Sequence, residues 1–253
     1  MEKIRIALIT GGSRGLGRDM ALKIADQGIN VILTYHSNKE KAEEVVKEIH
    51  AKGIKAIAYQ LDTSKIDTFD DVLSKVGAHL EEKTGSPKFD YLINNAGIGI
   101  KTPFTETTEA QFDELINIQF KGVYFFTQKA LKYLKDGGSI VNISTGLTRF
   151  VGPGYAIYAS AKSAIENLTR YLAKELSERQ IRVNVVAPGA IATDFAGGQL
   201  KNDEHYNYYI SSVTALGRPG VAEDIGGVVA FLCSEAAGWI NGQRIEVSGG
   251  MNL

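Results

Sequence analysis

Short runs of apolar, often β-branched residues recur along the chain and alternate with longer stretches whose apolar residues return every three or four positions. The short runs are typical of strands buried on both faces of a parallel sheet, and they cover 3–10, 30–35, 54–60, 89–95, 138–144, 181–187 and 242–249. The longer stretches predict helices over 15–27, 39–52, 66–83, 111–134, 155–179 and 222–234. This alternation predicts an α/β fold, a doubly wound parallel sheet of about seven strands with helices on both faces.

Residues 194–220 interrupt this rhythm. The segment DFAGGQLKNDEHYNYYISSVTALGRPG contains paired glycines, three tyrosines and a histidine between two regular elements. Such a stretch is a candidate lid over a binding site, and an ordinary surface excursion is the alternative. Because the chain has no internal repeat and no proline-rich linker, we expect residues 1–253 to form one domain.

Composition narrows the classes of partner. The chain has 28 basic and 29 acidic residues, a net charge of −1, so it lacks the electrostatic footprint of a protein that binds nucleic acid or an anionic membrane. We expect small molecules and further copies of the chain as partners. The single cysteine, Cys233, lies in an apolar run with no second cysteine for a disulfide or a metal cluster, and no run reaches the ~18 apolar residues of a membrane helix. We therefore expect core filling by Cys233, no metal site and a cytoplasmic location.

The sequence TGGSRGLG, residues 10–17, stands between the first predicted strand and the first predicted helix. Gly11, Gly15 and Gly17 would allow a tight turn and a close approach to a pyrophosphate, and the helix N-terminus would supply free N–H groups to the anion. The turn lacks the Gly-Lys-Ser/Thr ending of a nucleotide-hydrolysing P-loop. It predicts a Rossmann-type dinucleotide site.

Two further motifs follow predicted strands, NNAG at 94–97 and APGAIATDF at 187–195. Both would lie at the carboxyl edge of the sheet, where open α/β folds bind ligands. In the helix that begins near 155, Tyr158 and Lys162 are four residues apart, which puts both on one face about 6 Å apart along the axis. A nearby cation lowers a phenol pKa from its usual value of about 10. A chance surface pair is the alternative, and Tyr155 is a rival phenol.

Taken in order, TGGSRGLG, NNAG, YASAK and APGAIATDF resemble the short-chain dehydrogenase/reductase family, in the ketoreductase branch that includes the 3-oxoacyl-carrier-protein reductases. The resemblance spans the whole chain, through the closing GQRIEVSGGMNL. It implies that Tyr158 protonates the substrate carbonyl oxygen. It also implies that Lys162 holds the nicotinamide ribose and lowers the Tyr158 pKa, and that the chain forms a homotetramer.

Cofactor choice is set at the end of the second strand, where LTYHSN has no carboxylate to repel a 2′-phosphate. Arg14 adds a cation suited to phosphate, although a solvent-facing arginine is the alternative, and together the two features favour NADP(H). Asp62 resembles the family residue that meets the adenine amino group, and a helix N-cap is the alternative. The resemblance implies a cofactor site made of Gly11, Ser13, Arg14, Gly15, Leu16, Gly17, Tyr35, His36, Ser37, Asp62, Thr63, Asn95, Ala96, Gly97, Tyr158, Lys162, Pro188, Gly189, Ile191 and Thr193.

Two positions depart from the family pattern. The hydroxyl that orients the substrate carbonyl is usually a serine thirteen residues before the tyrosine, and this offset falls on Thr145, with Ser144 one step earlier. Spacing favours Thr145, and the two should point to opposite sides. A helix asparagine of the family is replaced by Gln119, and Asn117 lies roughly 200° around the helix from it.

These features predict an NADP(H)-dependent carbonyl reductase. The substrate would be a hydrophobic or aryl ketone, or a 3-oxoacyl thioester, in a pocket lined by Phe150, Val151, Tyr155, Phe195, Tyr206, Tyr208 and Tyr209. An alcohol or sugar dehydrogenase of the same family would use the same residues. A non-catalytic protein that senses NADP(H) is the second alternative, which the intact Tyr158 and Lys162 disfavour.

Overall fold

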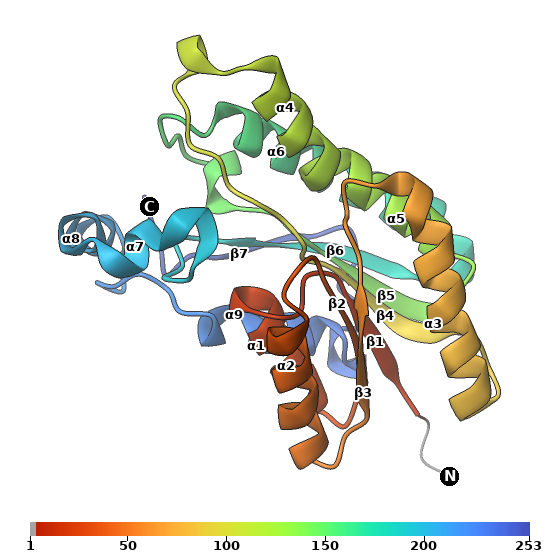
Figure 1. Ribbon diagram of the computed structural model, residues 1–253. Helices are drawn as coiled ribbons and strands as arrows, with labels where there is room; N and C mark the ends of the chain where they lie inside the picture. The colour runs from red at the N-terminus through yellow and green to blue at the C-terminus, as the bar shows by residue number, and fades with distance from the viewer. Residues whose placement is uncertain (1–3) are drawn as a thin grey trace.

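Seven parallel strands form one sheet in the order β3-β2-β1-β4-β5-β6-β7 (Figure 1). The structure, a computed structural model, describes residues 4–253. Residues 1–3 of the predicted domain, and with them residue 3 of the predicted first strand, lie outside the described residues. The order runs outward from β1 in one direction and from β4 in the other, which confirms the predicted doubly wound fold. The strands are β1 (Ile6–Ile9), β2 (Asn30–Tyr35), β3 (Ala56–Gln60), β4 (Phe89–Asn94), β5 (Leu134–Ile143), β6 (Arg182–Pro188) and β7 (Arg244–Val247).

Helices cover both faces of this sheet. Helices α1, α2 and α9 pack on one face, and α3, α5 and α6 pack on the other, with α4 against α6 (Figure 1). The helices are α1 (Gly15–Ala25), α2 (Lys39–Ala51), α3 (Phe69–Thr84), α4 (Glu109–Ile116), α5 (Val123–Ala130), α6 (Ala156–Glu175), α7 (Gln199–Asn202), α8 (Glu204–Ser212) and α9 (Glu223–Leu232).

The continuous apolar strands explain this layering. In β1, Ala7 and Ile9 point into the core cluster beneath α1, α2 and α9, whereas Ile6 and Leu8 point into the cluster on the opposite face. All four are at most 2% exposed, because successive strand residues alternate between two covered faces. Cys233 is buried in the first of these clusters, as predicted.

Two predicted boundaries differ clearly from the structure. The helix predicted over 111–134 is divided by a π-helical turn, Asn117–Gly122, and ends at Ala130. Strand β5 begins four residues before the predicted 138, because a bulge lets Gly137 lie within it at a φ of 76°. Across this bulge Phe89 pairs with Leu134, and Tyr91 pairs with Ser139.

The segment predicted as a lid contains three short helical pieces, a turn at Phe195–Gly198 followed by α7 and α8. Leu200 and Ile210 bury their side chains against Met251 near the end of the chain. Helices α7 and α8 are therefore attached to the C-terminal segment by a small apolar cluster. Within residues 4–253, every helix falls short of the length and apolarity that a membrane crossing requires.

Candidate active site

The carboxyl ends of four neighbouring strands carry the predicted motifs. The glycine-rich turn, residues 10–17, connects β1 to α1, and residues 94–97 follow from β4. Ser144 and Thr145 follow β5, and Pro188 ends β6. Because β1, β4, β5 and β6 are adjacent, the motifs meet at one edge of the sheet, beside the point where the strand order reverses.

Glycines let the turn after β1 fold tightly. Gly11 and Gly15 have φ values of 68° and 53°, in the left-handed region, and Ser13 lies half-buried between them. A β-carbon at Gly17 would overlap the Gly11 carbonyl oxygen. The N-cap residue of α1, Arg14, makes no capping hydrogen bond, so the first N–H groups of this helix are available to an anion.

The loop after β4 is clamped onto this turn. The Asn95 side chain donates to the carbonyl oxygens of Thr10 and Gly11, each at 3.0 Å. In return the Thr10 hydroxyl oxygen accepts from the main-chain N–H groups of Asn95 and Ala96, also at 3.0 Å. A β-carbon at Gly11 would come within 2.9 Å of the Ala96 Cα. Two segments of the predicted cofactor site are thus held together by the protein itself.

The segment after β6 approaches the same turn. Gly189 packs against Ser248, where an added β-carbon would lie 2.8 Å from the Ser248 Cα. Ile191 pairs with Gly220 in an isolated parallel bridge. The Thr193 Cβ would lie 3.8 Å from a β-carbon built on Gly15, so the entrance of the candidate lid lies over the glycine-rich turn.

Polar side chains surround the end of β2. Arg14 is exposed and makes no ion pair with any other residue of 4–253. His36 and Ser37 are also exposed, and the His36 ring lies 3.6 Å from the Asp62 carboxylate. Burial raises the pKa of Asp62, but hydrogen bonds from Ser64 and the charge of His36 outweigh it and hold this pKa below its usual value. Asp62 accepts from the Ser64 main chain and hydroxyl, so it closes a turn and does not cap α3.

Two residues of the predicted cofactor set face the core. Tyr35 is 8% exposed and belongs to the cluster between the sheet and helices α1 and α2. Leu16, in the first turn of α1, packs against the same cluster. The prediction is therefore corrected for their side chains, which fill the core, and only their main chains are left to face a cofactor.

Helix α6 brings Tyr158 and Lys162 together below this edge. The two side chains are 8% and 4% exposed, and the Lys162 Nζ lies 5.9 Å from the centre of the Tyr158 ring. The Lys162 Nζ donates to the Ile143 carbonyl oxygen at 2.8 Å, where β5 ends. Tyr158 and Lys162, four residues apart as predicted, thus form a buried pair beside Ile143, the last residue of β5. Their burial excludes the alternative of a chance pair on the surface.

The protonation of this pair differs from the prediction. Burial raises the pKa of Tyr158 above its usual value, and the hydrogen bond with Thr145 offsets only part of that rise. Burial also lowers the pKa of Lys162 to about 8. The predicted lowering of the Tyr158 pKa by Lys162 is therefore wrong for the protein alone, because both groups lose solvation and the ammonium already donates to Ile143.

The hydroxyls of Ser144 and Thr145 point to different partners. Burial raises the pKa of Tyr158, and the Thr145 side chain lies close enough to the phenol to lower it in part. The Ser144 hydroxyl donates to Glu166 at 2.6 Å, on the side of α6 that faces β7. Only Thr145 is therefore directed toward the phenol, in line with its spacing.

Gln119 lies inside the π turn and is fully buried. Its Nε2 donates to the Ile98 carbonyl oxygen, and its amide packs against Gly97, where an added β-carbon would lie 2.8 Å from the Gln119 Oε1. The other end of this turn meets Thr63, because a β-carbon at Gly122 would overlap the Thr63 carbonyl oxygen. The π turn is thus packed between two segments of the predicted cofactor site.

Aromatic rings gather beside Tyr158. The ring of Phe195 lies 5.8 Å from that of Tyr158, and the ring of Tyr155 lies 6.3 Å from it. Tyr206 and Tyr209 stack with 6.5 Å between their centres on α8. Burial raises the pKa of Tyr155, as it does for Tyr158. Phe150 packs against the apolar cluster beneath α7 and α8.

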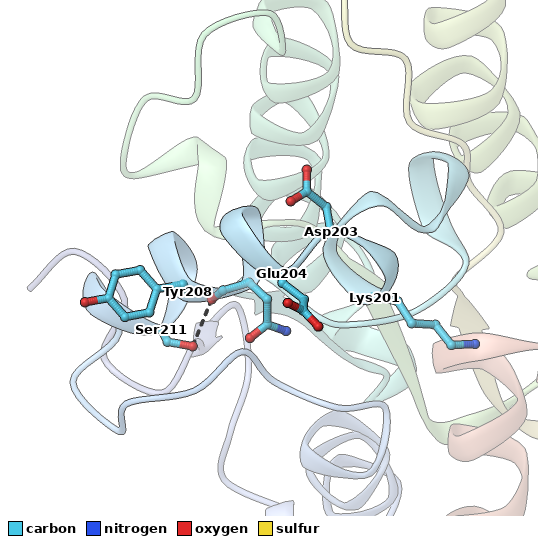
Figure 2. A pocket seen from close by; sticks show the side chains of 6 residues that line it. Lys201, Asp203, Glu204, Tyr208 and Ser211 are labelled. Carbon is cyan, nitrogen blue, oxygen red and sulfur yellow. Dashed lines mark hydrogen bonds between the residues drawn. The ribbon is translucent and has the colours of Figure 1, made fainter.

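Two residues of the predicted pocket lie outside this group. Val151 is almost fully exposed, and Tyr208 is 78% exposed. Tyr208 lines an open surface pocket of about 240 Å³ with polar residues of α7 and α8, including Lys201 and Glu204. Figure 2 shows these side chains. Neither side chain touches the aromatic group around Tyr158, so the predicted pocket is smaller than the sequence suggested.

Glu166 and Arg244 were not predicted as part of the site, yet they form a half-buried ion pair at 2.8 Å behind Ser144. Glu166 follows Tyr158 and Lys162 at four-residue steps on α6, a signal that the sequence does contain. Arg244 lies on β7, and no sequence motif around it marks it as part of the site. Among residues 4–253, no three His, Cys, Asp or Glu side chains gather where a metal ion could bind.

Known proteins of similar sequence are reductases. A family model described as Enoyl-(Acyl carrier protein) reductase matches residues 11–252. The 3-oxoacyl-[acyl-carrier-protein] reductase FabG of Staphylococcus aureus is 38% identical over 255 residues, which cover 100% of both proteins. The hydroxynaphthalene reductase-like protein Arp2 of Metarhizium brunneum is 34% identical over 257 residues, covering 97% of this chain and 94% of that protein.

A solved structure has the same fold over nearly its whole length. The crystal structure of angucycline C-6 ketoreductase LanV with bound NADP matches with a TM-score of 0.93 at 34% identity. The match covers 98% of this chain and 95% of that chain. The arrangement of strands and helices around the candidate site is therefore one that a ketoreductase uses.

Proposed function

The chain belongs to the short-chain dehydrogenase/reductase family, and we propose that it reduces hydrophobic ketones with NADPH, using Tyr158 as the general acid. One observation carries the proposal. Tyr158, Lys162 and Thr145 are buried together at the sheet edge where the glycine-rich turn and the Asn95 loop meet. A phenol in this place can deliver a proton to a carbonyl oxygen at the carboxyl edge of the sheet.

The residues present fit a dinucleotide. A β-carbon at Gly11 or Gly17 would fill the space where the turn, the Asn95 loop and α1 approach one another, and the free N–H groups of α1 suit a pyrophosphate. Lys162 would bind the nicotinamide ribose, and Arg14 with His36 and Ser37 would face the adenosine 2′-phosphate. When bound, the cofactor supplies the hydride.

Side chains of the protein would carry out the proton transfer and position the substrate carbonyl. Tyr158 is protonated at neutral pH even at the ordinary phenol pKa of about 10, burial raises this pKa further, and the phenol can release its proton to the oxygen of a bound ketone. The Thr145 hydroxyl accepts from the Leu147 main-chain N–H at 3.3 Å, which leaves its own proton to donate to the same carbonyl oxygen. Lys162 keeps the end of β5 fixed through its hydrogen bond to Ile143.

The substrate class we propose is a hydrophobic or aryl ketone, with a 3-oxoacyl thioester as the second candidate. The rings of Tyr155 and Phe195 flank Tyr158 and would cover a flat apolar substrate. The names of the relatives FabG and Arp2 include both kinds of substrate, a 3-oxoacyl group and a hydroxynaphthalene. The segment over 194–220, with Phe195 at its start, would act as the lid.

The test is NADPH consumption by the wild-type protein across aryl ketones, 3-oxo esters and 3-oxoacyl thioesters. We expect turnover with at least one class and the highest kcat/KM with an apolar ketone. Turnover of alcohols or sugars with NADP alone would favour a dehydrogenase. Binding of NADPH without turnover of any compound would favour a cofactor sensor and contradict the proposal.

Cofactor preference is tested at Arg14. We expect higher kcat/KM with NADPH than with NADH, and erosion of that preference in Arg14→Ala, because a charge-assisted contact to a phosphate contributes about 1.5 to 3 kcal/mol. The matched control is Arg18→Ala, one turn further along α1, where the arginine is already paired with Glu48. Equal or better efficiency of the wild type with NADH would contradict this part of the proposal.

We further propose a homo-oligomer, a tetramer as the family resemblance implies, in the cytoplasm. Trp239 is 100% exposed and Phe231 is partly exposed, near the open edge that β7 forms. Large apolar side chains of this kind favour a protein interface. Light scattering on the purified protein would measure the mass, and a monomer at micromolar concentration would contradict the oligomer.

A further inference from the structure

Three charged or polar side chains follow one another along the face of α6 that meets β5. Tyr158, Lys162 and Glu166 are spaced by four residues and therefore lie on one face. The proposed chemistry uses Tyr158 and Lys162 and leaves Glu166 without a role. The Glu166 side chain is only 15% exposed, so its charge must be compensated inside the protein.

Glu166 gathers three donors on a single oxygen. Its Oε1 accepts from the Ser144 hydroxyl at 2.6 Å, from the Thr148 hydroxyl at 2.7 Å and from the Arg244 Nε at 2.8 Å. Ser144 and Thr148 flank the short turn that contains Thr145. Hydrogen bonds to an ionised acceptor are among the strong ones, so Glu166 fixes this turn at both ends.

Arg244 reaches the same turn from β7. Its Nη2 donates to the Thr148 hydroxyl oxygen at 3.0 Å and lies 3.4 Å from the Thr145 carbonyl oxygen. Its Nη1 donates to Glu246 at 2.9 Å. The guanidinium is thus held by two carboxylates while it contacts the main chain of Thr145, a planar arrangement that lysine could not reproduce.

These contacts determine where the Thr145 hydroxyl points. The Thr145 Oγ1 accepts from the Leu147 main-chain N–H at 3.3 Å, which depends on the turn keeping its shape. The Thr148 hydroxyl has one proton, which goes either to Glu166 at 2.7 Å or to the Thr145 carbonyl at 2.9 Å. The carboxylate is the stronger acceptor, so Arg244 is left as the charged partner of the Thr145 carbonyl.

We infer that Glu166 and Arg244 are positioning residues that hold the turn over 144–148 so that the Thr145 hydroxyl faces Tyr158. The inference rests on the proposed reductase function, because the pair acts only through Thr145, whose hydroxyl has a role only in that reaction. Neither side chain would touch substrate or cofactor. Their removal should slow the chemical step and leave NADPH binding unchanged.

Arg179 provides a matched control, because it contacts the opposite end of β5. It lies just after α6, donates to Asp136 at 2.7 Å, and also contacts the main-chain oxygens of Leu131 and Leu134 near the start of β5. It therefore resembles Arg244 in pairing with a carboxylate and holding main chain, but at the opposite end of the strand. Arg179→Met should lower thermal stability and leave kcat within about twofold.

The first experiment compares Glu166→Ala, Arg244→Met and Arg179→Met with the wild type, measuring kcat, the Kd for NADPH by fluorescence, and the melting temperature. We expect kcat to fall about tenfold or more in the first two variants, which is about 1.4 kcal/mol of barrier, with Kd within twofold. Glu166→Gln, which keeps the shape and one acceptor, should restore part of kcat. Unchanged kcat in folded Glu166→Ala or in folded Arg244→Met would overturn the inference.

The second experiment is a double-mutant cycle with Thr145→Val, measured as single-turnover oxidation of NADPH at high enzyme concentration so that slow variants can be followed. If Glu166 acts through Thr145, Glu166→Ala should cost less than twofold once the Thr145 hydroxyl is gone. An equal loss in both backgrounds would overturn the inference. A wild type that reduces no ketone would instead contradict the proposed function, so the two failures are distinguishable.

Discussion

Burial shifts the pKa values of the two residues on which the proposed chemistry depends. The Tyr158 phenol is protonated at neutral pH even at its ordinary pKa of about 10, and burial raises this pKa further, whereas burial lowers the Lys162 pKa to about 8. A protonated phenol suits reduction, in which a proton is delivered to a carbonyl oxygen. Oxidation of an alcohol needs the phenolate, and the raised pKa makes this form harder to reach at neutral pH.

Tyr158→Phe removes the hydroxyl and keeps the buried ring. We expect turnover to be lost while the Kd for NADPH stays within about twofold, because the proton donor is removed and the ribose contacts are not. Lys162→Ala should impair both quantities, since the ammonium has a proposed contact with the ribose and a hydrogen bond to Ile143. Substantial activity in a folded Tyr158→Phe protein would transfer the role of acid to Tyr155.

The two neighbouring hydroxyls have separable effects. Thr145→Val keeps the shape of the side chain and removes the hydroxyl that we expect to donate to the substrate carbonyl beside Tyr158, so we expect a large fall in kcat. Ser144→Ala should cost less, because Glu166 still holds the turn through Thr148 and Arg244. Steady-state kinetics of both variants decide the ranking, and the reverse order would give the catalytic role to Ser144.

Among the secondary-structure elements, the π turn between α4 and α5 packs against two segments of the proposed cofactor site. Gln119→Ala should lower kcat less than tenfold, under about 1.4 kcal/mol of barrier. We expect the main-chain carbonyl at this position, and not the side chain, to hold a water that links Lys162 to solvent for proton exchange. The KM for NADPH should rise, since Ile98 loses the donor that fixes the loop after β4. Asn117→Ala, at the start of the same turn, is the control. A hundredfold loss of kcat with NADPH still bound would show that the Gln119 side chain takes part in the reaction.

The sequence predicts which elements form better than it predicts where they deform. Apolar runs identify all seven strands, because a strand buried on two faces has a continuous pattern. The π turn depends on Gly122 approaching the Thr63 carbonyl oxygen, and the early start of β5 depends on a bulge at Gly137. Such deformations come from contacts between distant segments, which periodicity within one segment does not record.

In the whole molecule, the candidate site combines contiguous motifs with contacts from distant parts of the chain. Tyr158 and Lys162 could be predicted, because four-residue spacing on a helix is local. Arg244 could not be predicted, since it is 78 residues from Glu166 in the sequence. It comes close to the end of β5 only because β7 follows β5 and β6 in the order of the sheet. The raised pKa of Tyr158 was also missed, because it depends on burial by several elements at once.

Glu246 connects the site to the end of the chain. Its carboxylate accepts from Arg149 at 2.7 and 2.8 Å and from Arg244 at 2.9 Å, and Arg149 also holds the carbonyl oxygens of Met251 and Asn252. Hydrogen bonds from Arg149, and then from Arg244, lower the pKa of Glu246 to about 2 although partial burial opposes them. Because the pKa in the unfolded chain is higher, this residue stabilises the fold above about pH 4.5, and the contribution is lost as the pH falls toward 2.

Glu246→Gln should therefore lower the free energy of unfolding more at pH 6 than at pH 3. The amide cannot carry the charge that both arginines face, but at low pH the wild-type carboxyl also becomes neutral. Urea unfolding at the two pH values measures the difference, with Glu178→Gln as a control at an exposed glutamate that has no ion pair among residues 4–253. An equal loss at both pH values would mean that Glu246 acts by packing and hydrogen bonding, without a contribution from its charge.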